Sequence, residues 1–257
     1  MGGQVQTLVS EVVPFSRRGQ AMGILMMGFS LASTVGVPFA LYLANWMNWH
    51  APFIFTALFS FIIWAVLWWV LPPVNLHLQS ERGFKHSWVV ISSLFKNKDT
   101  LTALLLPGSL MLSQFLIVSF INPFIEYNVL FSNDHTPMMY MFGGAATFIF
   151  ARKIGRMADQ YGKFNVFAIF TLISVFPILV ISHLPPLPYP LVFIITTFWF
   201  VTTIGRAIPS QALVSEAVPL NQRGAMMSIN SCFQMLFSGL ASLIAGFIIV
   251  SAPDGKL

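Results

Sequence analysis

The sequence predicts an all-α protein, a polytopic bundle of transmembrane helices, and three observations lead to this fold class. Charged residues make up 8% and apolar residues 56% of the 257 residues, whereas soluble globular proteins carry about 25% charged residues. Uncharged runs are long, and the longest extends from residue 19 to residue 80. Basic residues lie between these runs in a regular alternation. Because lipid satisfies no backbone hydrogen bonds, such a chain is expected to cross the membrane as helices.

The uncharged runs contain seven predicted membrane spans. A helix needs about 20 residues to cross the ~30 Å hydrocarbon layer, so the longer runs hold two crossings each, separated by segments rich in Pro, Asn, Trp and Tyr. Residues 1–13 are expected to form the second half of a further helix, which makes seven full spans plus a partial one. The spans are expected at 20–45, 51–71, 101–127, 136–154, 164–182, 190–214 and 225–251.

The basic residues predict a single orientation for all spans. Short cytoplasmic loops carry an excess of Lys and Arg, and of the thirteen basic residues only Lys256 falls on the opposite side. The alternation accounts for the net charge of +5 without a nucleic-acid partner. We therefore expect an integral protein of the cell membrane, with the lipid bilayer as its surroundings.

One segment of the sequence occurs twice. LVSEVVPFSRRG at 8–19 is repeated as LVSEAVPLNQRG at 213–224, and nine of fourteen residues are identical when 6–19 is aligned with 211–224, where chance would give about one. Six span-to-span steps separate the copies, so both face the same side, as in the parallel repeats of secondary transporters. The recurring charged residues, expected to brace cytoplasmic helix ends, are Glu11, Arg18, Glu216 and Arg223.

The duplicated segment resembles the end of helix four and the start of helix five of the major facilitator superfamily, duplicated at helices ten and eleven. GRMADQYGK (155–163) is similar to the loop motif G-x-x-x-D-x-x-G-[RK] of that family, between helices eight and nine. Residues 32–53 resemble the fifth-helix motif of its drug and sugar exporters, with Gly36 and Pro38 in G-x-P. Trp49 and Phe53 match W-R-x-x-F, and His50 replaces the usual Arg.

The resemblance implies an incomplete pair of six-helix halves. Residues 1–72 correspond to a remnant of the N-terminal half, and residues 101–257 to a C-terminal half without a twelfth helix. Residues 73–100 would be a cytoplasmic linker between the halves, either a plain linker or a short amphipathic helix on the membrane surface. On this interpretation the chain is a fragment.

Polar side chains within the spans are candidates for a substrate cavity. A buried amide needs water, a protein partner or substrate, so these residues either join helices by hydrogen bonds or line a cavity. Glu126, near the outer end of its span, either exchanges protons or is an interfacial carboxylate. The candidates share faces of two spans at four-residue spacing, Gln114, Asn122 and Glu126 on one and Asn230 and Gln234 on the other.

Arg206 is the deepest charged residue of the predicted spans. Inserting a cation at such depth costs about 3 kcal/mol, so a cavity or a counter-ion is expected beside it. Arg206 either recognises a charge linked to substrate or protons, or extends toward the cytoplasmic side or pairs with Glu216.

The loop motif is expected to act as a conformational latch. The resemblance implies that Asp159 meets the amino end of helix five, where Gly19 and Gln20 have unpaired backbone donors, and that this contact holds the halves together on the cytoplasmic side. Alternatively, Asp159 pairs only with Arg156 or Lys163 in a solvated turn. The candidate latch residues are Gly155, Arg156, Asp159, Gly162 and Lys163.

A stripe of small residues is expected to form the interface between helices five and eight. Gly28, Ala32, Gly36 and Ala40 recur every four residues, a spacing that permits close backbone approach. The predicted partners on helix eight are Gly143, Thr147 and Ala151.

These features favour a secondary active transporter that works by alternating access, with proton-coupled export of a small organic solute as the specific expectation. The alternative is a truncated, transport-inactive membrane protein with a structural or assembly role. An enzyme is not expected, because the five His are scattered and G-x-S-x-G, Walker and H-E-x-x-H motifs are absent from the sequence. No cofactor or metal is expected. The expected partners are a small-molecule substrate, protons and lipid.

Overall fold

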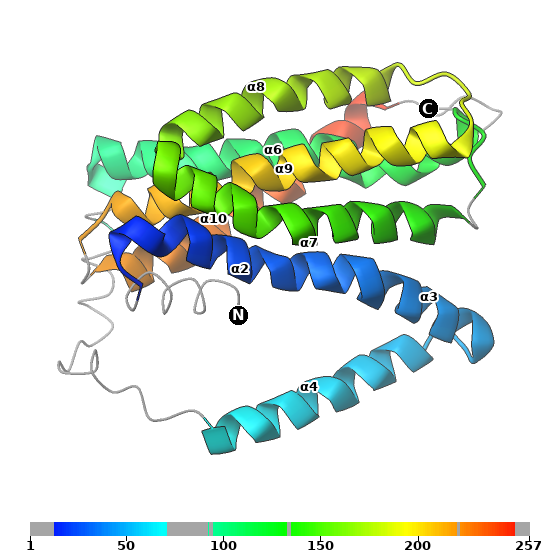
Figure 1. Cartoon of the computed structure of the whole chain (residues 1–257), viewed down its shortest axis with the longest axis horizontal. Helices are drawn as coiled ribbons and strands as arrows, with labels where there is room; N and C mark the ends of the chain where they lie inside the picture. The colour runs from blue at the N-terminus through cyan, green and yellow to red at the C-terminus, as the bar shows by residue number, and fades with distance from the viewer. Residues whose placement is uncertain (1–12, 71–91, 93–94, 133–134, 220–221, 250–257) are drawn as a thin grey trace.

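A computed structural model describes residues 13–70, 92, 95–132, 135–219 and 222–249, and every regular element within these ranges is helical. The prediction of an all-α membrane bundle is confirmed. The N-terminal part comprises a short turn η1 (Phe15–Arg17), α2 (Arg18–Leu31), a π-helical turn η2 (Ala32–Gly36), α3 (Val37–Trp46) and α4 (Ala51–Val70). The remainder comprises α6 (Lys98–Tyr127), α7 (Thr136–Tyr161), α8 (Lys163–Ser182), α9 (Tyr189–Glu216) and α10 (Arg223–Ile248) (Figure 1).

Five of the described helices, α4, α6, α8, α9 and α10, are long and apolar enough to cross a membrane. They coincide with five of the seven predicted spans. The predicted span 20–45 is divided among α2, η2 and α3. The predicted span 136–154 is α7, which has 26 residues but continues past 154 to Tyr161 through a polar, charged last part. The charged residues near the end of α7 interrupt the apolar run from which the span was predicted, but they do not end the helix. The predicted boundary therefore falls before the observed end of α7.

The helices pack in neighbouring pairs. α6 lies along α10, α8 lies along α9, and α7 lies between α2 and α9 (Figure 1). One buried apolar cluster, which includes Ile125, Met139 and Trp199, joins the last part of α6 to the first parts of α7 and α9. A second, around Met22 and Ile154, joins α2, α7, α8 and α9 near the other end of the bundle. These contacts place the amino end of α2 beside the carboxyl end of α7.

α4 diverges from the bundle and makes its main contacts with α3 (Figure 1). Most of its large apolar side chains are exposed, among them Trp69, which is 90% exposed. Phe55 stacks on Phe59 along the helix surface, with ring centroids 6.2 Å apart. In a membrane protein such a surface meets lipid or further apolar protein, because water would make it costly.

The close approach between α2 and α7 corrects the predicted small-residue stripe. A Cβ added to Gly23 would lie 2.6 Å from the carbonyl oxygen of Ala151, whereas one added to Gly28 would meet nothing within 4 Å. Ala32 and Gly36 are exposed as well. Further along, the contact is made by Thr34, which would meet a Cβ on Gly144 of α7.

The physical reason is the helical phase. At 100° per residue, Gly28 lies nine residues and therefore half a revolution from Gly19, which also contacts α7. Four-residue spacing identifies a stripe but does not say which stripe meets the neighbouring helix. Of the predicted partners on α7, Ala151 lies at this contact, whereas Gly143 packs against Phe200 of α9.

Gly23→Ala and Gly28→Ala form a matched pair that tests this interface. Both replace a helical glycine and gain similar helix propensity, up to about 1 kcal/mol. Gly23→Ala places a methyl group against a backbone carbonyl that cannot rotate away, so we expect a net loss of about 1–3 kcal/mol. Gly28→Ala is expected to be neutral or stabilising. Unfolding in mixed micelles measures both, and equal effects would contradict this description of the interface.

Candidate functional site

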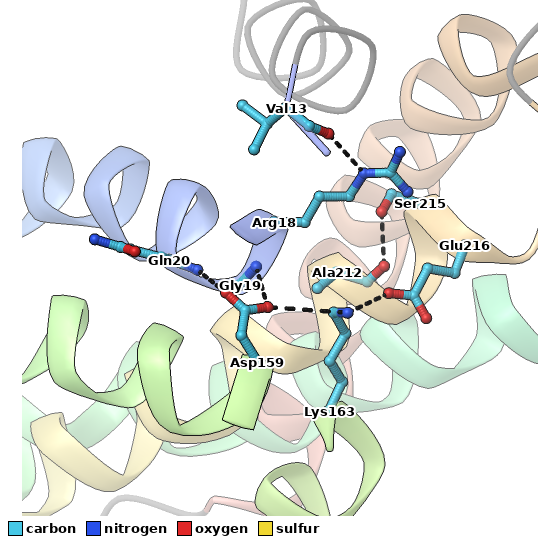
Figure 2. A network of polar contacts seen from close by, with 9 residues as sticks. All are labelled: Val13, Arg18, Gly19, Gln20, Asp159, Lys163, Ala212, Ser215 and Glu216. Atoms are coloured by element: carbon cyan, nitrogen blue, oxygen red, sulfur yellow. Dashed lines mark hydrogen bonds and ion pairs between the residues drawn. The ribbon is translucent and has the colours of Figure 1, made fainter. Parts of the chain in front are cut away.

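The candidate site is a polar network where the amino ends of α2 and α8 meet the carboxyl ends of α7 and α9 (Figure 2). Asp159 lies in the last turn of α7, and its carboxylate points at the first turn of α2. Its Oδ1 accepts a hydrogen bond from the backbone N–H of Gly19 and its Oδ2 from that of Gln20, each at 2.9 Å. These donors have no partner inside α2, and the helix dipole adds partial positive charge there. One carboxylate thus satisfies two orphan donors across the interface.

Two glycines make this contact possible. A Cβ on Gly19 would lie 2.6 Å from the carbonyl oxygen of Gly155 and 2.7 Å from Oδ1 of Asp159. A Cβ on Gly155 would in turn collide with the carbonyl oxygen of Gly19. The two backbones therefore approach too closely for any side chain at either position. This explains why the short Asp side chain reaches α2.

Lys163 connects the carboxylate to α9. It is the first residue of α8, and its Nζ lies 2.7 Å from Oε1 of Glu216 and 3.9 Å from Oδ1 of Asp159. The Lys163 and Asp159 side chains are only 7% and 8% exposed. Gly162 has a φ of 91°, a conformation that glycine adopts without steric cost, and this turn brings Lys163 back toward Asp159. The lysine therefore lies between two carboxylates.

Asp159 contacts the amino end of α2, so it does not pair only with Arg156 or Lys163 in a solvated turn. Its carboxylate is bonded to the first turn of α2 and also lies 3.9 Å from Lys163, while Arg156 is exposed. The sequence missed the pairing of Lys163 with Glu216. The available signal was that Lys163 ends the loop motif and Glu216 lies in the repeated segment. Glu216 pairs with Lys163 and not with Arg206, which is ten residues away on the same helix.

Most of the predicted cavity residues lie apart from one another. Asn230 is fully buried and donates from Nδ2 to Oε1 of Gln211 at 2.9 Å, a hydrogen bond between α10 and α9 that the sequence missed. Asn122 is exposed and accepts from the Tyr140 hydroxyl at 3.2 Å. The remaining members, Gln114, Glu126 and Gln234, are partly buried.

A cavity of about 370 Å³ lies between α6, α8 and α10, and its walls are almost wholly apolar. Leu116, Phe120 and Ile178 are among its lining residues, and it contains none of the predicted polar candidates. Within the described residues, no three His, Cys, Asp or Glu side chains are grouped as metal ligands would be. The helix-to-helix alternative therefore describes Asn230 better than cavity lining does.

The remaining predicted residues fall at helix ends or outside the described ranges. Arg18 and Arg223 begin α2 and α10 and are buried, and Arg18 donates from Nε to the carbonyl oxygen of Val13 at 3.2 Å. Pro38 stands in the first turn of α3, just after the π-helical turn. Glu11 and most of the predicted linker (73–100), namely residues 73–91 and 93–94, lie outside the described residues.

Comparison with known proteins identifies relatives for nearly the whole chain. The sequence profile of the Major Facilitator Superfamily matches residues 4–242. A probable sugar efflux transporter of Helicobacter pylori (strain J99 / ATCC 700824) is 30% identical over 168 residues, 65% of this chain and 41% of that protein. The probable sugar efflux transporter of Pasteurella multocida (strain Pm70) is 24% identical over 247 residues, 95% of this chain and 58% of that protein.

A third relative, the uncharacterized MFS-type transporter YfhI of Bacillus subtilis (strain 168), is 28% identical over 268 residues, 94% of this chain and 64% of that protein. No solved structure matches the chain. The chain thus spans about half the length of the curated relatives it matches. The family match confirms the resemblance found in the motifs, the membrane localisation and the expectation of a non-enzyme.

A double-mutant cycle tests the link between α8 and α9. Lys163→Met leaves Glu216 without its cation, and Glu216→Gln leaves Lys163 without its nearest anion, so the two changes together should cost less than their sum. We expect a coupling free energy of about 1–3 kcal/mol from unfolding in mixed micelles. The cycle of Lys163→Met with Asp99→Asn, an exposed aspartate of α6, should be additive within about 0.5 kcal/mol. Equal coupling in both cycles would contradict the contact.

Proposed function

We propose a transport function for this chain, which belongs to the Major Facilitator Superfamily. The proposed activity is alternating-access movement of a small organic solute across the membrane, with export of a sugar as the first candidate. Two of the relatives are named probable sugar efflux transporters, and that name supplies the substrate class. The observation that carries the proposal is the contact of Asp159 with Gly19 and Gln20.

The contact supports alternating access because directed hydrogen bonds join two helices there, and because it lies at one end of the bundle. It joins the first turn of α2, where the first repeat copy ends, to the last turn of α7. Breaking it exposes a carboxylate and two backbone donors that water can solvate, so the closed and open states differ by the small free energy that a two-state transporter needs. In this proposal Asp159 closes the cytoplasmic side, and Lys163 with Glu216 holds it in position.

A transport-inactive protein with a structural or assembly role is the second candidate. The observation that favours it is that the chain spans only 41–64% of the length of the three relatives described above. The two candidates differ in one measurable property, which is solute flux.

Flux through the purified chain in proteoliposomes distinguishes the candidates. We expect counterflow of at least one radiolabelled sugar from a panel, at a rate above that of empty liposomes. Asp159→Asn removes the charge that binds the amino end of α2 and should reduce the rate about tenfold or more, while the matched change Asp99→Asn should leave it unchanged. An intact, helical chain with no flux of any panel member would overturn the transport proposal in favour of the second candidate.

Proton coupling is a separate part of the proposal and rests on Glu126. Glu126 is a partly buried carboxylate near the end of α6, on the helix that also carries the predicted cavity residues Gln114 and Asn122. We expect Glu126→Gln to abolish uptake driven by a pH gradient while counterflow persists, because exchange needs no net proton movement. Gradient-driven transport that survives Glu126→Gln would assign coupling to another group.

A further inference from the structure

The interface between α8 and α9 contains a buried cation with an unused donor. Arg206 lies within α9 and is 5% exposed. Its Nη1 donates to the Ser174 hydroxyl of α8 at 3.4 Å, while its Nη2 is buried and has no hydrogen-bond partner in the described part of the chain. A guanidinium does not give up its proton in proteins, so this group stays charged and needs an acceptor.

Two hydroxyl groups at the same depth also lack partners. The helices are antiparallel, and the contacts Lys163 to Glu216 and Ser174 to Arg206 fix their register. This register places Thr171 of α8 at the level between Arg206 and Ser210 of α9. The Oγ1 of Thr171 and the Oγ of Ser210 are both buried without a hydrogen-bond partner in the described residues. The Nη2 of Arg206 and these two hydroxyl groups therefore lie within about one helical turn of one another along the helix pair. The Oγ1 of Thr203, three residues from Arg206 on α9, is likewise buried without a partner in the described residues.

The described carboxylates lie elsewhere and leave the charge of Arg206 unbalanced. Asp159 and Glu216 are bound in the cytoplasmic network, and Glu216 is ten residues from Arg206, about 15 Å along the helix. Asp99 is in the first turn of α6, and Glu126 is near that helix's other end. A cation taken out of water is retained only when an opposite charge or several hydrogen bonds replace the lost solvation. One long hydrogen bond to Ser174 does not do this.

We propose that Arg206, Thr171 and Ser210 bind a small monovalent anion between α8 and α9. Arg206 supplies the charge, and Thr171 and Ser210 supply hydroxyl donors that have no partner in the described residues. The hydroxyl of Ser174 is already used, because it donates to the carbonyl oxygen of Thr171 at 2.7 Å and accepts from Arg206. The anion must be small because the helices are tightly packed here, and a Cβ on the neighbouring Gly205 would collide with the ring of Phe170. It is monovalent because one cation faces it. The site shares Arg206 with the predicted substrate cavity but none of its other members, and it is separate from the network around Asp159.

Chloride is the probe for this site. In the first measurement, the purified full chain in lipid nanodiscs is unfolded by heat in sodium chloride and in sodium gluconate at matched ionic strength. In the second, the ³⁵Cl NMR line width is measured with and without bromide as competitor. We expect Tm to rise with chloride and saturate, with no rise in gluconate, and a chloride line that the protein broadens and bromide narrows. Arg206→Met should lose both effects, while Arg152→Met, at an exposed arginine of α7, should keep them.

Ser210→Ala keeps the test decisive if Arg206→Met does not fold. It removes a hydroxyl donor that has no partner in the described residues and leaves the contact of Arg206 with Ser174 in place, so we expect chloride to bind at least fivefold more weakly by both measurements. Ser182→Ala is the matched control, because that exposed serine of α8 bonds only locally, to Leu179 and His183. Identical unfolding in chloride and gluconate with no line broadening would mean that water or protein groups satisfy Arg206. Broadening that persists in both Arg206→Met and Ser210→Ala would place chloride elsewhere. Either result overturns the proposal.

Discussion

The hydrogen bonds from the first turn of α2 to Asp159 are the constraint on which the cytoplasmic side of the structure depends. They need a backbone separation that only Gly19 and Gly155 permit, and a carboxylate short enough to lie between the two helices. They also need Lys163, which balances the charge of Asp159 and connects it to Glu216 at the end of α9. Each requirement is met by a residue of the loop motif or of the repeated segment. The loop motif and the repeated segment thus supply the two sides of one contact.

Charge is distributed by depth in this bundle. At the end of the bundle where α2 begins, carboxylates meet a lysine and backbone donors, so the ionic contacts lie at helix termini. Deeper in, helices are joined by neutral groups, such as Asn230 with Gln211 and Ser119 with Ser242 at 2.8 Å. Neutral pairs cost less to bury than ion pairs. Arg206 departs from this distribution, because its charged side chain is buried deeper in the bundle, within α9.

The sequence predicted the helices and the Asp159 contact but not the packing phase. Hydropathy and charge are properties of single residues, so they locate the spans without any knowledge of the packing. The loop motif and the repeated segment together placed Asp159 beside Gly19. Gly28 and Gly36 had the right spacing on the wrong face, since periodicity carries no information about which face meets a neighbour. The pairs Lys163 with Glu216 and Asn230 with Gln211 were missed for a related reason. Their formation depends on the register between helices, which the summed packing of many side chains determines.

The energetics of the contacts suggest which parts move together. α8 with α9, and α6 with α10, share long apolar surfaces, and separating such surfaces costs about 25 cal/mol for each Å² exposed. The first turn of α2 is held at Asp159 by two charge-assisted hydrogen bonds, each worth about 1.5–3 kcal/mol, and water recovers much of this when they break. The surface between α2 and α7 is as extensive as either of these, so separating it fully would cost as much. The lower-cost rearrangement is therefore a tilt of α2 that opens at Asp159 while most of its surface stays packed on α7, with the paired helices moving as rigid units. The backbone contact of Gly23 with Ala151, one turn further along α2, then lies on the pivot side of that opening.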